Sequence, residues 1–555
     1  MGSQLATPRS DAAVRVRPAG RSRPGRADIG FGLGVLAQLV AVLVWPRPVT
    51  VDGPAHLLGA TVLAHYGDPQ HPIYRALYRI DPFPSPNLLT EPVLALLVRV
   101  VSLGVAEKII IATYAVLLPV ALRYAARGVR RDSGWLWVAA LPLTFNYLFF
   151  YGFFNYCIGL ALCLFVAGYA LRRSGAWRPL STVWLGVLLV LGYLAHLVPF
   201  ALALVFVAAA AAVRAIEDVR AGGPVAPALV RRLGPPALAA VPGLALTAAF
   251  LLRTDEASAP SWNFPLGHLG GLLTLMMPIV TFNYAEAVPA VLAAAVLLGL
   301  AAVAARRWGR TAVRRGAGPL LATAVATVLV LAAPSKFGID FGFINERLSY
   351  FPVLFGVLWL AAQPWGRRAR RWATGGLLVA AVLLALVRVP ALAHYDRLIA
   401  EYETVAGVIR PGSTLIAVRF DELTPPGGPV RNSHWDPVRH VESRLAAETY
   451  GVDIGHYEAV LDYFPTRFRE SRDLRRAIDP TLKGFEEAPP RIDLSRAVRK
   501  GRPGIDYVLV VAPDAGHLGD PRVAEVRRDL RGYYRKVAET EPSGLVEVWQ
   551  ARAFR

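Results

Sequence analysis

The stretch Val51–His65, VDGPAHLLGATVLAH, follows the first apolar segment of the chain and organises what comes after it. Asp52 stands where the polypeptide has just left that segment, and His56 lies one helical turn later on the same face. The order Asp-Gly-Pro favours a helix that begins at Gly53 or Pro54, because Asp is a good N-cap and Pro is tolerated in the first turn. Asp52 is therefore either a cap alone or a cap that also holds a functional carboxylate at the membrane surface.

The composition is that of an integral membrane protein. The 555 residues are 54% hydrophobic and have a mean hydropathy of +0.41. Apolar segments long enough to cross a hydrocarbon core of about 30 Å recur between residues 29 and 391. The net charge of +20 does not indicate nucleic-acid binding, because the arginines gather in short loops between apolar segments, the pattern that orients membrane proteins.

Residues 88–104 decide the predicted topology. They are apolar but contain Glu91 and Arg99, and a charge at the centre of a span costs about 2.5–3.5 kcal/mol. We therefore expect this segment to lie along the outer surface, which places five later arginine clusters in the cytoplasm. The eleven expected spans are residues 29–45, 106–126, 134–152, 156–171, 182–198, 200–216, 236–252, 286–304, 318–334, 347–363 and 373–391.

The predicted fold is a polytopic α-helical membrane protein of about eleven transmembrane helices with a C-terminal extracytoplasmic α/β domain. The expected parts are a disordered cytoplasmic tail (residues 1–28), the transmembrane domain (29–391) and the α/β domain (392–555), and the expected location is the bacterial plasma (inner) membrane. In the last part, hydrophobic patterns predict strands at Thr414–Val418, Tyr507–Val511 and Val546–Ala551 and helices at Val438–Thr449 and Pro521–Leu530.

A second informative stretch is Lys336–Tyr350, KFGIDFGFINERLSY, which leads directly into a span. Asn345, Glu346 and Arg347 therefore occupy the start of a membrane helix. Helix N-termini attract anions, and an arginine adds a bidentate partner, so a lipid phosphate is the anion expected at this depth. The alternative is that Glu346 pairs with Arg347 or another loop charge and only marks the interface.

Further polar residues lie on the same expected side of the membrane. Asn155 and His196 stand at outer helix ends, where polar groups face a cavity or a partner helix, so each either lines the site or supports it. A polar run follows Val51–His65 and comprises His65, Asp68, His71, Arg75, Arg79 and Asp81. A divalent-metal site built from Asp52, His56 and one member of this run is an alternative that the spacing does not decide, so no metal ligand or cofactor is assigned. The segment His434–His440 is expected to be a surface loop.

Together these features resemble the GT-C superfamily of integral-membrane glycosyltransferases, which includes protein O-mannosyltransferases and bacterial aminoarabinose transferases acting on lipid A. The resemblance rests on a cytoplasmic N-terminus, a long first outer loop, an acid soon after the first span and an extracytoplasmic C-terminal domain. Family members often carry paired acids where this chain has Asp52 to His56. Asn155 stands where some members place another acid.

The resemblance implies a donor sugar linked to polyprenyl phosphate or diphosphate and an acceptor hydroxyl on an extracytoplasmic glycan, lipid or protein. It implies that Asp52, with His56 beside it, acts as general base in an inverting transfer. Arg347, with Lys336 or Arg75, would then stabilise the departing phosphate. Asp52 is accordingly expected to face a cavity at the outer membrane surface.

Two other classes of protein remain open from the sequence. One is a lipid or polysaccharide transporter, which is disfavoured because transport pathways mark themselves with ionisable groups near the midplane and these spans hold few. The other is a non-catalytic protein of cell-envelope assembly whose outer domain binds partners.

Overall fold

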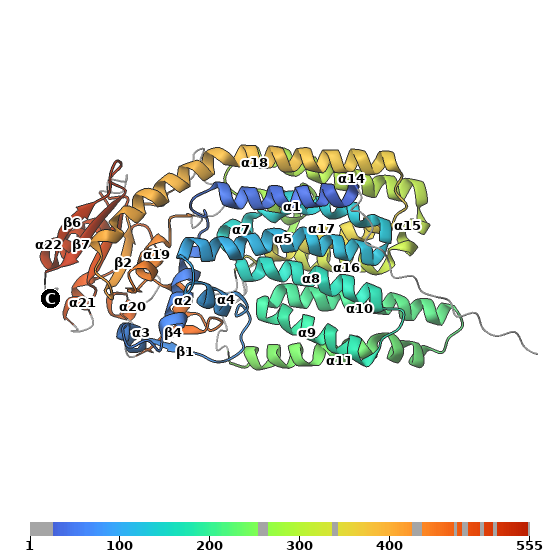
Figure 1. Cartoon of the computed structure of the whole chain (residues 1–555), viewed down its shortest axis with the longest axis horizontal. Coiled ribbons are helices and arrows are strands. Elements are labelled where there is room, and N and C mark those ends of the chain that lie inside the picture. Colours follow the sequence, from blue (N-terminus) through green and yellow to red (C-terminus); the bar gives the residue numbers. More distant parts are fainter. Residues whose placement is uncertain are drawn as a thin grey trace, which may run out of the picture.

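The protein is an elongated molecule with a bundle of long helices at one end and a mixed α/β region at the other (Figure 1). The computed structural model describes residues 26–253, 265–335, 342–423, 436–470, 474–479, 487–499, 504–513 and 519–552. The first loop and part of the C-terminal region meet between the two ends, and the candidate site lies there.

The bundle is built from α-helices and two 3-10 segments. These are α1 (Arg26–Val44), α5 (Leu103–Val129), η1 (Arg131–Ala140), α6 (Leu141–Thr144), α7 (Tyr147–Tyr151), α8 (Phe154–Arg173), α9 (Pro179–Ala195), α10 (Leu197–Arg220), α11 (Val225–Leu251), α12 (Pro265–Leu273), α13 (Met276–Ile279), η2 (Tyr284–Glu286), α14 (Ala287–Trp308), α15 (Arg310–Arg315), α16 (Ala317–Ala332), α17 (Ile344–Ala361) and α18 (Arg367–Glu403). Between α1 and α5 the chain forms α2 (Gly53–His65), α3 (Pro72–Leu77), β1 (Tyr78–Ile80) and α4 (Thr90–Leu97).

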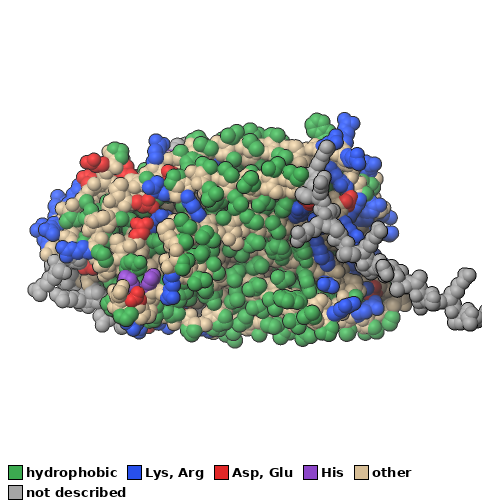
Figure 2. Space-filling view, viewed as in Figure 1, with side chains coloured by type: hydrophobic (Ala, Val, Ile, Leu, Met, Phe, Trp, Pro, Cys, Tyr) green, Lys and Arg blue, Asp and Glu red, His purple; other side chains and the backbone are tan. Residues whose placement is uncertain are grey.

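The bundle has the dimensions and surface of a membrane domain. Among the described residues, six helices are long and apolar enough to cross a membrane, and three apolar helices are shorter. Hydrophobic side chains cover the middle of the bundle, and Lys and Arg gather at the end far from the α/β region (Figure 2). The protein is therefore a multi-pass membrane protein, whereas its orientation and its number of crossings stay predictions.

The segment that decides the predicted topology holds one short helix, α4, and ends at the start of α5. Within residues 88–104, α4 has eight residues, which is about 12 Å of helix and too short for a hydrocarbon core of about 30 Å. It packs against α2 near the junction (Figure 1). This agrees with the expectation that residues 88–104 do not cross.

The expected span over residues 134–152 is not one helix. The structure divides it into η1, α6 and α7. Pro142 lies in the first turn of α6, where a residue without an N–H is tolerated. The side chain of Asn146 accepts a hydrogen bond from Phe149 N at 2.9 Å and caps α7. Hydropathy alone does not show such breaks, because the segment stays apolar throughout.

The C-terminal region holds a five-stranded mixed sheet in the order β3-β2-β5-β7-β6. Strand β2 runs parallel to β3 and β5, whereas β7 runs antiparallel to β5 and β6. Its elements are η3 (Thr404–Val408), β2 (Thr414–Arg419), α19 (Val441–Glu448), β3 (Val452–Asp453), η4 (Tyr457–Val460), β4 (Thr466–Phe468), α20 (Arg475–Ile478), α21 (Leu494–Arg499), β5 (Tyr507–Val511), α22 (Pro521–Tyr533), β6 (Tyr534–Glu539) and β7 (Val546–Ala551). The three strands and two helices expected here are confirmed. Helix α18 runs without interruption through the expected domain boundary at residue 391.

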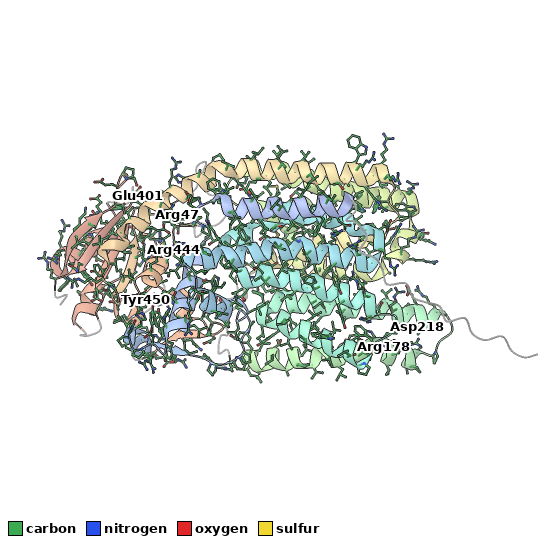
Figure 3. The ribbon with its side chains drawn as sticks, viewed as in Figure 1. Arg47, Arg178, Asp218, Glu401, Arg444 and Tyr450 are labelled. Carbon is green, nitrogen blue, oxygen red and sulfur yellow. The ribbon has the colours of Figure 1, made fainter. Side chains whose placement is uncertain are left out.

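The C-terminal region is tied to the first loop and to the bundle. Strand β1 of the loop pairs antiparallel with β4. Arg444 of α19 lies 3.0 Å from Glu403 of α18 and 3.5 Å from Glu107 of α5, and Arg47 pairs with Glu403 at 2.7 Å. Figure 3 shows Arg47 and Arg444 at this junction, far from Asp218 at the other end of the bundle. Ion pairs and a shared ladder thus hold the three parts together around α2.

Candidate active site

Asp52 precedes α2 but does not cap it with its side chain. No side-chain cap hydrogen bond is made at this position, so the alternative of Asp52 as a cap alone is wrong. The backbone N–H of Asp52 donates to Tyr151 O at 3.0 Å, and that of Val51 donates to Phe150 O at 3.1 Å. These bonds fix Asp52 against the turn between α7 and α8, two sequence-distant segments that were both expected on the outer side.

Gly152 makes this close approach possible. Its φ is +96°, and a Cβ added there would lie 2.7 Å from the backbone nitrogen of Asp52. A left-handed backbone angle and a lack of space for a side chain both require glycine. The turn between α7 and α8 therefore belongs to the Asp52 site through its backbone.

The carboxylate of Asp52 is covered by the C-terminal region. Its exposed fraction is 5%, Nε2 of His440 lies 3.8 Å from its Oδ1, and the Tyr457 hydroxyl hydrogen-bonds to it. Asp52 is thus buried in this structure, and the expectation that it faces a cavity at the outer membrane surface stays a prediction. The expectation of a surface loop is wrong for His440, which is half-buried; His434 lies outside the described residues.

Burial dominates the acidity of Asp52. It raises the pKa of the carboxyl group to about 7, although the charge of His56 and the hydrogen bond from Tyr457 oppose the shift. A carboxylate with this pKa can accept a proton at neutral pH and hold it long enough to act as a general base. The site therefore has a buried group suited to proton transfer.

His56 lies one turn along α2 and contacts two other carboxylates. Its Nδ1 is 2.6 Å from Oε1 of Glu458 and 3.0 Å from Oε1 of Glu91, while Nε2 is 3.0 Å from Gly152 O. Because both ring nitrogens face acceptors, His56 is an imidazolium. Burial alone would lower the pKa of His56, but the charges of Glu458 and Glu91 outweigh burial and raise it well above its ordinary value. We call His56, Glu91 and Glu458 the closed group.

The pKa values of the two carboxylates in the closed group shift in opposite directions. Burial raises the pKa of Glu91. It would also raise that of Glu458, but the charges of His56 and His456 outweigh it, so the pKa of Glu458 falls below its ordinary value. Glu458 is therefore the ionised partner of His56. The charges of His56 and Glu458 act on Asp52 through space.

Sequence reasoning missed most of this environment. Glu91 was noticed only as a charge that disfavours a span, and Glu458, Tyr457 and His440 were not associated with Asp52. One local signal exists at Gly59, where a Cβ would lie 3.1 Å from Oε2 of Glu458. Without the fold, however, nothing connects that glycine to a residue so far along the chain.

Arg347 lies at the start of α17, as predicted, and is 8% exposed. Its guanidinium stands 4.7 Å from the centre of the Phe153 ring, and its backbone oxygen accepts a 2.6 Å hydrogen bond from Tyr156. Within the described ranges, its Nε is buried without a hydrogen-bond partner. The guanidinium is close enough to Asp52 for an electrostatic interaction. A buried cation with an unused donor is suited to an anion.

Three of the remaining predicted residues make hydrogen bonds that hold helix ends in place. Asn155 holds the start of α4 by accepting from Thr90 N at 2.9 Å and donating to Asn87 O at 2.8 Å. Nδ1 of His196 accepts from Val198 N and caps α10. Asn345 donates to two carbonyls at the end of α16.

Glu346, Arg75 and Lys336 are the other residues predicted to bind substrate. Glu346 is half-buried on α17. Arg75 is exposed on α3, which follows the end of α2 opposite Asp52. Lys336 lies outside the described residues.

Two sets of side chains among the described residues have the composition and spacing of metal ligands. One is the closed group, and the other is His65, Asp68 and His71, which we call the open group. Neither contains Asp52, so the alternative that joined Asp52, His56 and one member of the polar run is not formed.

No protein-family model matches the sequence, and no curated protein matches it. A solved structure does: ArnT from Cupriavidus metallidurans in the apo state aligns with a TM-score of 0.51 and 14% sequence identity. The alignment covers 95% of this chain and 98% of that chain. The chain has an ArnT-like fold. The predicted resemblance to GT-C proteins is confirmed at the level of the fold, and at 14% identity the likeness to ArnT shows the fold alone.

Proposed function

We propose that the protein is an integral-membrane glycosyltransferase of the GT-C type. It transfers a sugar from a polyprenyl-phosphate or diphosphate donor to an acceptor hydroxyl on the extracytoplasmic side, with inversion at the anomeric carbon. The acceptor is a glycan, a lipid or a protein. The ArnT-like fold supports the class of enzyme, and the environment of Asp52 supports the chemistry.

One observation carries the proposal: Asp52 is a buried carboxylate with no capping role and a pKa of about 7. In the transfer, Asp52 takes the proton of the acceptor hydroxyl while that oxygen bonds to the anomeric carbon. The bond from the anomeric carbon to the donor phosphate breaks, and the phosphate oxygen keeps the electron pair. We expect the acceptor hydroxyl to replace Tyr457 as the hydrogen-bond partner of Asp52.

Arg347 is the group we assign to the leaving phosphate. Its guanidinium is buried, carries an unpartnered Nε within the described ranges and lies within electrostatic range of Asp52. Negative charge develops on the phosphate as the bond breaks, and a preorganised cation stabilises that charge most in a water-poor site. The base and the cation would thus act on opposite ends of the same displacement.

The test replaces Asp52 and follows both donor binding and transfer. In purified full-length protein, Asp52→Asn should abolish transfer from a polyprenyl-phosphate sugar, because an amide cannot take up the proton. Donor binding should stay near that of the parent, and the melting temperature should not fall below the parent's. Asp218→Asn, at the opposite end of the bundle (Figure 3), is the matched control and should retain transfer. Full activity of Asp52→Asn would remove the base and overturn the proposal.

A second variant separates donor binding from chemistry. Arg347→Ala should weaken binding of a polyprenyl-phosphate donor by about 1.5–3 kcal/mol, the range for a hydrogen bond to a charged group. Arg75→Ala is its control, since Arg75 is an exposed arginine on α3 and should leave donor binding unchanged. Equal effects of the two substitutions would show that general surface charge, rather than the buried site, holds the phosphate.

A further inference from the structure

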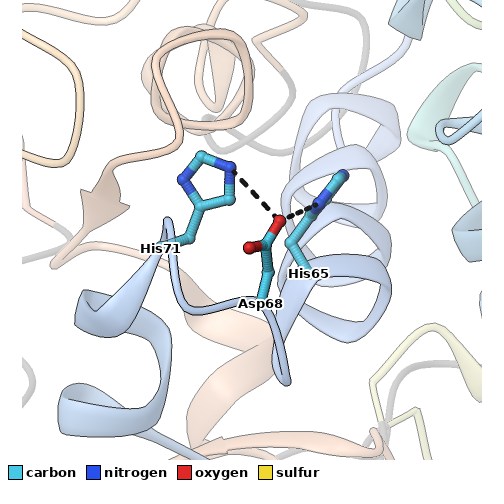
Figure 4. A group of neighbouring side chains, drawn as sticks. All are labelled: His65, Asp68 and His71. Atoms are coloured by element: carbon cyan, nitrogen blue, oxygen red, sulfur yellow. Dashed lines mark ion pairs between the residues drawn. The ribbon is translucent and has the colours of Figure 1, made fainter.

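The open group gathers three potential metal ligands in one short turn. His65 is the last residue of α2, Asp68 lies in the turn, and His71 precedes α3. Backbone hydrogen bonds from Asp68 N to His65 O (3.0 Å) and from His71 N to Asp68 O (3.1 Å) close two successive turns. These turns place all three side chains on one side of the loop (Figure 4).

The carboxylate of Asp68 is positioned to serve both histidines. Its Oδ1 accepts a 2.9 Å hydrogen bond from Gln70 N, which fixes the group. Its Oδ2 lies 3.7 Å from Nδ1 of His65 and 3.9 Å from Nε2 of His71. Figure 4 shows Asp68 between the two rings. Both distances are too long for hydrogen bonds, so the two histidines are not satisfied by this carboxylate.

The spacing fits a shared metal ion. Zn²⁺ binds imidazole nitrogen and carboxylate oxygen at about 2.0–2.2 Å in tetrahedral geometry, which places neighbouring ligand atoms about 3.4 Å apart. The ligand atoms of the open group lie within 4.8 Å of one another, so closing on an ion requires movements of a few tenths of an ångström to about 1 Å. Two nitrogens and one carboxylate oxygen favour a zinc-like transition metal over Mg²⁺ or Ca²⁺.

Tyr450 of the C-terminal region holds the two rings in place. It stacks on His71 with ring centres 4.0 Å apart and an interplanar angle of 11°, and it meets His65 edge-on at 5.3 Å. The backbone of Tyr450 has a φ of +50°, which is uncommon for an aromatic residue. The imidazoles are thus preorganised by a residue from outside the turn.

Space for a further ligand lies next to the group. A surface depression of about 390 Å³ is lined by His65, Asp68, Tyr450 and Arg99, among others. Arg99 donates to Ala64 O, and its positive charge favours water or an anion at the remaining coordination position. Three protein ligands with one open position form a recurrent type of zinc site.

We propose that His65, Asp68 and His71 bind one divalent transition-metal ion of the zinc class, with a water or an anion as the fourth ligand. The ion would join the α2–α3 turn to the C-terminal region, because Tyr450 packs on two of its ligands. Helix α2 has 13 residues, about 20 Å, so the ion lies far from Asp52 and takes no part in proton transfer there. The proposal is independent of the proposed glycosyl transfer.

The test measures metal binding directly in tag-free, metal-stripped full-length protein. Equilibrium dialysis against Zn²⁺ should give one ion per chain, and Co²⁺ should give the visible absorption of a tetrahedral site. His65→Ala, Asp68→Asn and His71→Ala should each weaken Zn²⁺ binding by more than the roughly 10–100-fold typical of losing a supporting residue. His71→Cys, which keeps a zinc ligand, should retain binding, and His394→Ala on α18 is the matched histidine control.

The outcomes decide the assignment. Stoichiometric binding that is lost in the three ligand variants and kept in His71→Cys and His394→Ala supports it. Absence of stoichiometric binding in the parent protein overturns it. Binding that persists in all three ligand variants also overturns it, because the ion would then lie elsewhere in the chain.

Discussion

Helix α2 contributes one histidine to each of two groups of histidine and carboxylate side chains, His56 on its first turn and His65 at its end. In the closed group, His56 meets Glu91 and Glu458 at 2.6–3.0 Å, and all three are buried. In the open group the corresponding distances are 3.7–3.9 Å, the residues are half-buried and a depression adjoins them. Histidine and carboxylate composition alone does not distinguish an ion-pair network from a ligand site; burial and spacing do.

The difference follows from how each group is assembled. The closed group brings together α2, α4 and η4, so the fold has fixed its charges in a dry environment where each needs its partners. The open group comes from one turn, whose side chains still reach solvent. Loss of one partner should therefore be costly in the first group and nearly neutral in the second.

The largest expected effect is that of Glu458→Ala. It removes the ionised partner of a buried imidazolium, and breaking a buried pair in this way costs about 3–5 kcal/mol of stability. Thermal or denaturant unfolding in a defined detergent measures the change. Glu525→Ala, an exposed glutamate on α22, is the control and should stay within about 0.5 kcal/mol. A loss below about 1 kcal/mol for Glu458→Ala would show that the closed group is not a mutually dependent ion pair.

The limits of sequence reasoning follow from the same contrast. Asp52, His56 and Arg347 were found because each has a local signal: an acid after the first apolar segment, a histidine one turn later and an arginine at a helix start. The helices were found because hydropathy is a local property, and strand β5 lies exactly where its apolar run predicts. Glu458 and Tyr457 have no such signal, because their place at Asp52 depends on the pairing of β1 with β4. The missing cap at Asp52 is likewise a matter of backbone geometry that residue types do not specify.

The second expected effect concerns the two aspartates that stand at opposite ends of α2. Burial raises the pKa of Asp52 to about 7, whereas a backbone hydrogen bond from Gln70 lowers that of Asp68. The base must be ionised, so transfer should fall about tenfold per pH unit below pH 7, equivalent to about 1.4 kcal/mol per unit. The pH dependence of the single-turnover transfer rate measures this decrease. If the transfer rate fell only near pH 4, Asp52 would not be the titrating base.

The same pKa has a consequence for stability with a definite sign. Because the folded state raises the pKa of Asp52, ionisation disfavours folding, and this penalty grows as the pH rises from the unfolded value towards 7. Asp52→Asn should therefore be more stable than the parent at pH 8, and the advantage should vanish near pH 4. A greater stability of the parent at pH 8 would contradict a raised pKa of Asp52 in the folded state.

A third and smaller effect is expected from a pair of glycines. In Gly59→Ala the new Cβ would lie 3.1 Å from Oε2 of Glu458. Overpacking destabilises a protein by about 1–3 kcal/mol, and the higher helix propensity of alanine offsets up to about 1 kcal/mol of this. We therefore expect the free energy of unfolding to fall by about 1 kcal/mol. In Gly67→Ala, beside the open group, nothing lies within 4 Å of the new Cβ, and the change should be neutral or slightly stabilising. Equal unfolding free energies of the two variants would show that the closed group accommodates an added methyl group as easily as the turn does.

The smallest effect tests the open group without its ion. Asp68→Asn changes a half-buried carboxylate that makes no hydrogen bond to either histidine, and the amide oxygen can still accept from Gln70 N. In metal-free buffer we expect the free energy of unfolding to change by no more than about 0.5 kcal/mol.

Added Zn²⁺ should raise the melting temperature of the parent, because a ligand that binds only the folded state stabilises it by mass action. The stabilisation is about 2.7 kcal/mol at 100 times the dissociation constant. Asp68→Asn should lose most of that increase. If metal-free Asp68→Asn were instead as unstable as Glu458→Ala, the turn would be an ion-pair network like the closed group, and the distinction between the two ends of α2 would fail.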